Sequence, residues 1–221
     1  MANVSDLVTR LRKRVGDNPP DEDVLARVCE DSDVESFITQ AVGEFSAHRP
    51  HTAKRLITLT DTLTYDWPTE VLGITRLDIQ DGRRLAECVV SWDYLEEGYV
   101  RNGDYLLDSG YRKIVFTMAN AADLAGTVIE LYCYVTHTIP ADAAAELVTA
   151  STLLDEEVDI AMLRAEALYR GQMANKIVIL AVIGDGSSAN HGLAMNFIQA
   201  QVDKLNAEFL EKVSSASHAR L

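Results

Sequence analysis

Apolar residues recur at helical spacing through the first fifty residues, which predicts a series of N-terminal helices. Val4, Leu7, Val8, Leu11 and Val15 fall on one helical face, and Gly16 follows where a C-cap is expected. Residues 21–30 repeat this spacing over a shorter stretch that opens on three acids. Residues 32–35 have the pattern of a capping box, and the apolar stripe after them predicts a helix that ends near Pro50.

From Arg55 onward the hydrophobic period becomes that of strands. Several short segments are rich in β-branched or alternating apolar residues, and Asp81-Gly82, Asn102-Gly103 and Ser109-Gly110 separate them. The predicted strands are residues 56–60, 62–65, 71–79, 86–92, 98–101, 105–107, 112–118 and 127–138. Short strands joined by turn residues indicate a small antiparallel sandwich or barrel.

Helical spacing returns after Pro140. It predicts one long alanine-rich helix over residues 141–169, a second helix over 193–213, and a loose polar tail over 214–221. Between the two helices, the apolar run 177–183 fits either a strand or the buried end of the preceding helix, and residues 184–188 form a loop. The chain is therefore expected to be α+β, with helical ends on both sides of a β-rich middle.

The chain is acidic, and this charge narrows its possible partners. It has 34 Asp and Glu against 20 Lys and Arg, for a net charge of −14. Such a balance disfavours a protein that wraps or reads DNA, because that binding rests on clustered cations. It is compatible with a surface past which DNA slides without sticking. No apolar run is long enough to cross a bilayer or act as a signal peptide, so we expect no membrane span and no export.

Residue patterns that carry chemistry are scarce, so we expect no enzyme, cofactor or metal site. The glycines of residues 184–188 lack the lysine of a phosphate-binding loop. His48 and His51 flank Pro50 and are predicted to lie in a surface loop. Cys29, Cys88 and Cys133 are far apart among apolar neighbours, which predicts buried reduced thiols. The acids of residues 155–159 point to different sides of a helix, which is typical of a solvated face.

Three segments, taken in their order along the chain, resemble the head-to-tail adaptor family of tailed bacteriophages. They are the helix ending of residues 41–50, the residues Tyr65-Asp66-Trp67-Pro68 with Leu72-Gly73-Ile74 after them, and Thr138-Ile139-Pro140 before an alanine-rich helix. The resemblance spans most of the chain and is weakest over 177–190. It implies a helical bundle built from residues 1–53 and 140–221, with residues 54–139 as an inserted antiparallel β-sandwich or small barrel.

The resemblance also implies a function. A structural protein of the virion neck is expected, made in the host cytoplasm, which forms a ring of about twelve copies beneath the portal protein. The ring would extend the channel through which genomic DNA passes without sequence-specific binding, and would bind a downstream neck or tail protein. The expected channel-lining residues are Asp155, Glu156, Glu157 and Asp159. The expected portal-docking arm comprises Phe209, Leu210, Val213, Arg220 and Leu221.

Two other readings of the sequence stay open. One is a different oligomeric virion protein or ligand-binding module, in which the β-rich insert is the binding surface. The other is an enzyme whose catalytic residues meet only in the folded chain. A deep pocket with strongly perturbed carboxylates would favour the enzyme, and an exposed aromatic cluster on the insert would favour the binding module.

Overall fold

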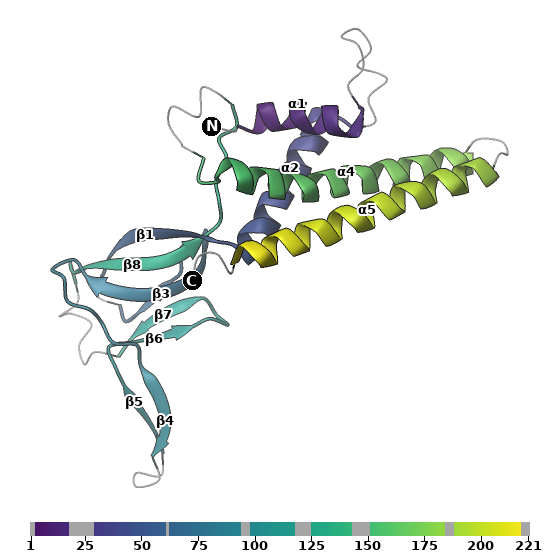
Figure 1. Cartoon of the computed structure of the whole chain (residues 1–221). Coiled ribbons are helices and arrows are strands. Elements are labelled where there is room, and N and C mark those ends of the chain that lie inside the picture. Colours follow the sequence, from purple (N-terminus) through teal and green to yellow (C-terminus); the bar gives the residue numbers. More distant parts are fainter. Residues whose placement is uncertain are drawn as a thin grey trace. The chain divides into compact units, whose positions relative to one another are not determined.

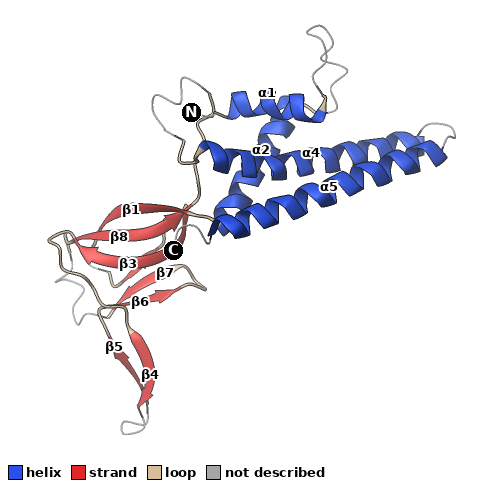
Figure 2. Cartoon of the chain, viewed as in Figure 1, coloured by secondary structure: helices blue, strands red, loops and turns tan. Residues whose placement is uncertain are grey.

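The computed structural model describes residues 3–17, 29–60, 62–93, 98–117, 125–142, 151–183 and 188–217. The chain forms two compact units: Met1–Arg49 with His137–Leu221, and Pro50–Thr136. We call the first the helical unit and the second the β unit, as Figure 2 shows by their colours. The fold is α+β, with N- and C-terminal helices flanking the strands in sequence, as predicted.

The helical unit contains α1 (Val4–Val15), α2 (Asp31–His48), α4 (Asp155–Ile183) and α5 (Ser188–Ser217), labelled in Figure 1. Helix α1 begins where the Asn3 side chain accepts a hydrogen bond from the Asp6 backbone N–H at 2.9 Å. It ends at Gly16, whose φ of 77° is the left-handed conformation that favours glycine, so the predicted C-cap is confirmed. The short helix predicted over 21–30 falls mostly on residues outside the described ranges.

Helix α2 begins earlier than predicted. Its cap residue is Glu30 rather than Ser32, and the Asp33 carboxylate accepts a hydrogen bond from the Glu30 N–H at 3.3 Å. The helix ends at His48, just before Pro50, as the sequence indicated. The predicted surface loop around the two histidines is wrong, because His48 closes α2 and His51 opens a strand.

Helix α4 corrects the predicted helix over 141–169 and answers one open question. Residues 151–154 are not helical, because tertiary contacts hold this segment against the chain near Thr138. The Thr152 N–H donates to the Thr138 carbonyl at 3.1 Å, and the Thr138 N–H donates to Thr152 Oγ1 at 2.9 Å. The helix starts only at Asp155 and then continues through the apolar run 177–183, which is therefore helix and not strand.

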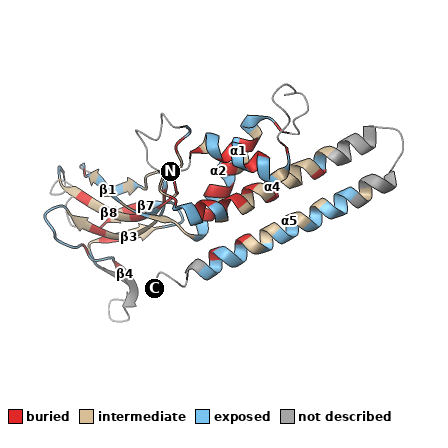
Figure 3. Cartoon of the chain, turned by 45° about the horizontal axis from the view of Figure 1, so that its top comes forward, coloured by how far each residue is buried: buried red, intermediate tan, exposed pale blue. Residues whose placement is uncertain are grey.

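All of these helices contribute to one apolar core. Its fully buried members include Leu11 from α1, Ile38 and Phe45 from α2, and Met162 from α4, and α5 adds Phe209 and Val213. Burying a side chain of this size contributes about 1.5–3 kcal/mol, so these contacts dominate the packing of the unit. Figure 3 shows the buried positions gathered on α1, α2 and the first half of α4, while α5 is largely exposed.

The β unit consists of short antiparallel strands. They are β1 (His51–Thr58), β2 (Thr64–Asp66), β3 (Val71–Ile79), β4 (Val89–Asp93), β5 (Gly98–Asn102), β6 (Tyr105–Asp108), β7 (Lys113–Phe116) and β8 (Val128–Val135). Each predicted strand has a counterpart, but some bounds differ. β1 begins five residues before the predicted residue 56, β4 begins three residues after the predicted residue 86, and β8 ends three residues before the predicted residue 138. The sheet orders are β1-β8-β3, β2-β7-β6 and β4-β5.

The two three-stranded sheets share one apolar core. Along β8 the side chains alternate, so that Ile129, Leu131, Cys133 and Val135 are buried. Ile114 and Phe116 from β7 and Tyr105 from β6 belong to the same cluster. Two sheets that bury their inner faces together form the sandwich-like arrangement expected for the insert. Among the described strands, β4 and β5 pair only with each other.

Candidate functional site

The acidic start of α4 is the first candidate surface. Asp155 and Glu156 are exposed at the N-terminus of the helix, where carboxylates are stabilised by the helix dipole. Glu157 differs from them, because it is only 4 % exposed. Its carboxylate accepts a hydrogen bond from the Leu154 N–H at 3.0 Å and lies 3.6 Å from the Arg49 guanidinium. Glu157 therefore caps its own helix and faces the interior of its own chain, unlike the other predicted lining residues.

Asp159 contributes less negative charge to this surface than the sequence suggested, because two arginines pair with it. Its Oδ1 lies 2.8 Å from a guanidinium nitrogen of Arg10 and 2.9 Å from one of Arg14, both from α1. The acidic segment contains no basic residue of its own, so the cations come from almost 150 residues away. The run of basic residues in α1 is visible in the sequence, but only the fold shows that its partner is Asp159. Asp155 and Glu156 make no ion pair within the described part of the chain.

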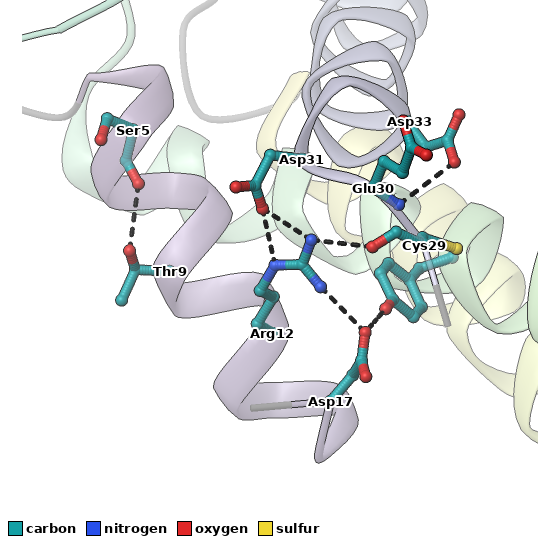
Figure 4. A network of polar contacts seen from close by, with 9 residues as sticks. Ser5, Thr9, Arg12, Asp17, Cys29, Glu30, Asp31 and Asp33 are labelled. Carbon is teal, nitrogen blue, oxygen red and sulfur yellow. Dashed lines mark hydrogen bonds and ion pairs between the residues drawn. The ribbon is translucent and has the colours of Figure 1, made fainter. Parts of the chain in front are cut away.

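A buried polar network joins α1 to the start of α2 and to the middle of α4 (Figure 4). Arg12 is only 3 % exposed, and its guanidinium donates to Asp17, Asp31 and the Cys29 carbonyl at 2.6–3.0 Å. The Tyr169 hydroxyl donates a short hydrogen bond to the same Asp17 carboxylate. Because Arg12 and Tyr169 both bond groups of other segments, the network is suited to fixing three segments in place.

Burial and hydrogen bonding within this network shift the pKa values of Arg12, Tyr169 and Cys29. Burial acts to lower the pKa of Arg12, but the hydrogen bond and charge of Asp31 outweigh it and leave the pKa raised. Burial, followed by the hydrogen bond to Asp17, raises the pKa of Tyr169 well above its usual value. Burial also raises the pKa of the Cys29 thiol, which makes it a poor nucleophile. Cys29, Cys88 and Cys133 are all buried free thiols, as predicted.

A groove of about 310 Å³ lies among α2, α4 and α5 and forms the second candidate surface. Its lining includes an ion pair in which Arg164 Nε and a terminal nitrogen contact Glu44 at 2.5 and 3.1 Å. The other terminal nitrogen of Arg164 donates to Asn206 Oδ1 at 2.7 Å. The hydrogen bond from Arg164 lowers the pKa of Glu44. The hydrogen bonds among these lining residues orient their polar groups, so the groove is suited to binding another protein.

The predicted portal-docking arm begins inside the core rather than outside it. Phe209 and Val213 are each 3 % exposed, and Phe209 stacks edge-on against His48 with ring centroids 6.3 Å apart. Leu210 is 52 % exposed and lies at the groove. Helix α5 continues to Ser217, so residues 214–217 of the predicted tail are helical, and Arg220 and Leu221 lie outside the described residues. Phe209 and Val213 therefore anchor the helix, and Leu210 is the described arm residue that is open to a partner.

The described ranges contain neither a cluster of metal-type ligands nor a membrane-spanning helix. No three His, Cys, Asp or Glu side chains gather there as a metal site would require. No helix in those ranges is both long and apolar enough to span a membrane.

Comparison with known proteins identifies one family whose sequence profile matches this chain. The profile of the family described as SU10 adaptor protein matches residues 2–209, which covers both compact units almost completely. Among curated proteins, no sequence matches the chain significantly. The chain therefore belongs to the SU10 adaptor protein family, a family of structural head-to-tail adaptors of phage virions.

Proposed function

We propose that this protein forms a ring of twelve copies in the phage neck. The ring binds the portal protein on one face and a downstream neck or tail protein on the other, and it extends the channel for genomic DNA. Membership of a head-to-tail adaptor family supports a structural role in the virion. The observation that carries the ring itself is the open surface of α5.

Helix α5 pairs with α4 and leaves apolar side chains uncovered. Phe197 is 65 % exposed, and Met195 and Leu210 on the same helix are also exposed. Figure 3 shows this exposure along much of the helix, although α4 and α5 lie side by side over their length. Large exposed apolar residues on one element are typical of a protein interface, so α5 is the surface that packs against neighbouring copies.

Imaging of the purified protein with the portal protein of the same phage tests this proposal. We expect twelvefold rings stacked on the portal. Phe197→Asp should prevent the rings, because it places a charge in the apolar contact between copies. Asn196→Asp is the matched control, since it adds the same charge at the neighbouring exposed position and should still assemble. Wild-type protein that ignores the portal, or Phe197→Asp rings identical to wild type, would contradict the proposal.

Exposed acids at the start of α4 support a channel wall that does not hold DNA. We propose that Asp155 and Glu156 provide most of this negative charge, because Asp159 is paired with arginines and Glu157 is buried. Asp155→Lys with Glu156→Lys should make assembled rings retain duplex DNA at low salt, because added cations bind phosphates. Glu35→Lys with Glu211→Lys changes the charge equally at other exposed positions. If both double variants retained duplex DNA equally, Asp155 and Glu156 would not line the channel.

The end of α5 supports a contact with the portal. We propose that Leu210 and the segment that ends in Arg220 and Leu221 dock there, while Phe209 and Val213 hold the helix in the core. Deletion of residues 214–221 keeps both anchors and should weaken binding to portal rings. Unchanged binding, measured by co-sedimentation with portal, would assign the docking surface to another part of the chain.

A further inference from the structure

Helix α5 carries one large aromatic side chain that is mostly uncovered. Phe197 is 65 % exposed, more than Met195 or Leu210 of the same helix. Ala194 and Ala200, one turn away on either side, are exposed as well, and their side chains are short. Figure 1 shows the first half of α5, which contains Phe197, beside α4 and beyond the ends of α1 and α2. The ring of Phe197 therefore stands on a part of the unit that a neighbouring molecule can reach.

The groove among α2, α4 and α5 lies on the opposite side of α5 from Phe197. Asn206, which lines the groove, follows Phe197 by two and a half helical turns, so the two side chains point in opposite directions. The groove residues of α5 also lie roughly 14–20 Å further along the helix axis, at about 1.5 Å per residue. Phe197 therefore does not fill the groove of its own chain.

The groove has the room and the lining that an aromatic ring needs. Its volume is about 310 Å³, whereas a cavity of about 150 Å³ already holds benzene. The Arg164 side chain is 23 % exposed there and donates to Glu44 and Asn206. A guanidinium group donates in its own plane, so these hydrogen bonds leave its faces for stacking on an aromatic ring.

Two further side chains make the groove suitable for an apolar ring. His48 is exposed, and its own ring packs edge-on against Phe209 with centroids 6.3 Å apart. Leu210 adds an aliphatic side chain that is 52 % exposed. Aromatic pairs at such spacing contribute energy beyond the area that they bury, so a second ring beside His48 would extend an existing aromatic contact.

We propose that Phe197 of one copy inserts into this groove of the next copy, against Arg164 and His48. The inference rests on the ring proposed above, and it names the surface that receives α5. The inserted residue and the groove are different surfaces of the same chain. Such a head-to-tail contact is the kind that closes rings. Leu210 also lines the groove, so the contact between copies adjoins the proposed contact with the portal.

Disulfide trapping on portal-bound protein tests this contact. Chains with Phe197→Cys are mixed with chains with His48→Cys and assembled on the portal, and the three natural cysteines are buried. Mild oxidation should join the two kinds of chain through positions 197 and 48, as identified by mass spectrometry. Asn196→Cys is the matched control, because its side chain points about 100° away around the helix. No disulfide from position 197, or equal yields from positions 196 and 197, would overturn the proposal.

Other occupants of the groove would give different products. Chains with Leu221→Cys, mixed with His48→Cys chains, test the end of the chain. A disulfide from this pair, without one between positions 197 and 48, would assign the groove to the C-terminal tail. A photoreactive phenylalanine at position 48 that cross-links to the portal protein alone would assign it to the portal. Either result would overturn the proposal.

Substitutions at the exposed positions give a second measurement. Phe197→Ala should raise the protein concentration needed for half-maximal assembly on the portal by about 30-fold, the loss of an interface hot spot. His48→Ala should raise it less, and the double variant should resemble Phe197→Ala, because both substitutions remove the same contact. Asn196→Ala should leave it unchanged. Effects that multiply in the double variant, or equal effects of Asn196→Ala and Phe197→Ala, would overturn the contact.

Imaging of the same samples separates this contact from the ring proposal. Wild-type rings on the portal, combined with no disulfide between positions 197 and 48, would reject the groove contact and leave the ring standing. An absence of wild-type rings on the portal would reject the ring and the groove contact with it.

Discussion

The helical unit and the β unit differ in whether their polar and charged side chains are buried. The buried polar or charged residues among the described positions all belong to the helical unit: Asn3, Arg12, Asp17, Ser46, His137 and Glu157. In the β unit, the Arg55–Glu70 pair is about half exposed, and the Lys54–Glu130 pair joins a half-exposed lysine to a carboxylate that is only partly buried. Its core is formed by apolar residues with Tyr105 and Cys133. One unit uses buried polar contacts to fix its segments, and the other uses backbone geometry.

Two buried networks give the helical unit its specific arrangement. Arg12 ties α1 to Asp17 and Asp31. His137 donates its N–H to Ser46 Oγ at 2.9 Å, and its ring nitrogens lie 2.9 Å from the Arg49 carbonyl and 3.1 Å from Thr152 Oγ1. A buried polar group without its partner is costly, so such networks favour a single packing of the helices.

Backbone geometry has the corresponding role in the β unit. Glycines with positive φ, Gly82 and Gly103, occupy turns between strands, and the strand register fixes which side chains enter the core. The difference predicts that each unit can be weakened by a different kind of substitution.

Arg12→Met should cause the largest loss of stability. It leaves the Asp17 carboxylate buried without its cation, and breaking a buried ion pair in this way costs about 3–5 kcal/mol. Urea unfolding followed by circular dichroism measures the loss. Hydrogen exchange should rise in peptides covering residues 4–15 and 155–176 before it rises in residues 128–135.

Arg10→Met is the matched control for that substitution. Arg10 pairs with Asp159, but both side chains are about half exposed, so its loss should cost no more than about 1 kcal/mol. Equal losses for Arg10→Met and Arg12→Met would show that the buried network does not stabilise the helical unit. The contrast between the two units would then fail.

Gly103→Ala should have the next largest effect, and in the β unit. Its Cβ would meet Cys88 Cα at 2.5 Å and Cys88 N at 2.7 Å, so backbone must shift. Overpacking and the positive φ together should cost about 3 kcal/mol, measured by urea unfolding with hydrogen exchange over residues 51–58 and 128–135.

Gly82→Ala provides the control for the glycine substitution. Its φ is 94°, but a Cβ there meets nothing within 4 Å, so only the conformational cost of about 1 kcal/mol applies. A Gly103→Ala protein as stable as Gly82→Ala would mean that the Cys88 backbone moves away from the added Cβ at little cost.

Tyr169→Phe should cost about 1–2 kcal/mol at neutral pH, because Asp17 loses a hydrogen-bond donor. The effect should shrink at high pH. Burial and the bond to Asp17 raise the pKa of Tyr169, so the native state keeps its phenol proton while the unfolded state loses it above about pH 10. The unfolded state then binds fewer protons, and wild-type stability falls as the pH rises.

Urea unfolding at intervals from pH 8 to pH 11 measures this difference. The gap between wild type and Tyr169→Phe should narrow above about pH 10. A constant gap would mean that Tyr169 ionises alike in both states. The hydrogen bond to Asp17 would then not keep Tyr169 protonated, and the buried network would be weaker than its geometry indicates.

The sequence predicted the elements whose signals are local. Helix α1, with its C-cap at Gly16, follows from spacing within a dozen residues, and β3 follows from a single run rich in apolar and β-branched residues. The buried alternation of β8 was also visible, because every second residue is apolar. Such features depend on side chains near one another along the chain.

Features that depend on distant residues were missed or misplaced. Asp159 read as part of an acidic face, but Arg10 and Arg14 reach it from α1. The late start of α4 depends on Thr138 holding Thr152 out of the helix, although the segment between them is rich in alanine. Arg12 read as one of several basic residues, and its partners Asp17, Asp31 and Tyr169 meet only in the fold.

Asp33→Ala should give the smallest effect, and it distinguishes the two possible caps of α2. The sequence pattern placed the capping box at Ser32, whereas in the structure Asp33 accepts a hydrogen bond from the Glu30 N–H. Loss of this bond, and of a carboxylate in the first turn, should cost about 0.5–1 kcal/mol in urea unfolding. Ser32→Ala removes an exposed hydroxyl inside the first turn and should change stability less. If Ser32→Ala were the more harmful substitution, α2 would begin at the predicted cap. Asp31 would then precede the helix, and the ion pair between Asp31 and Arg12 would hold the segment before α2 rather than the helix itself.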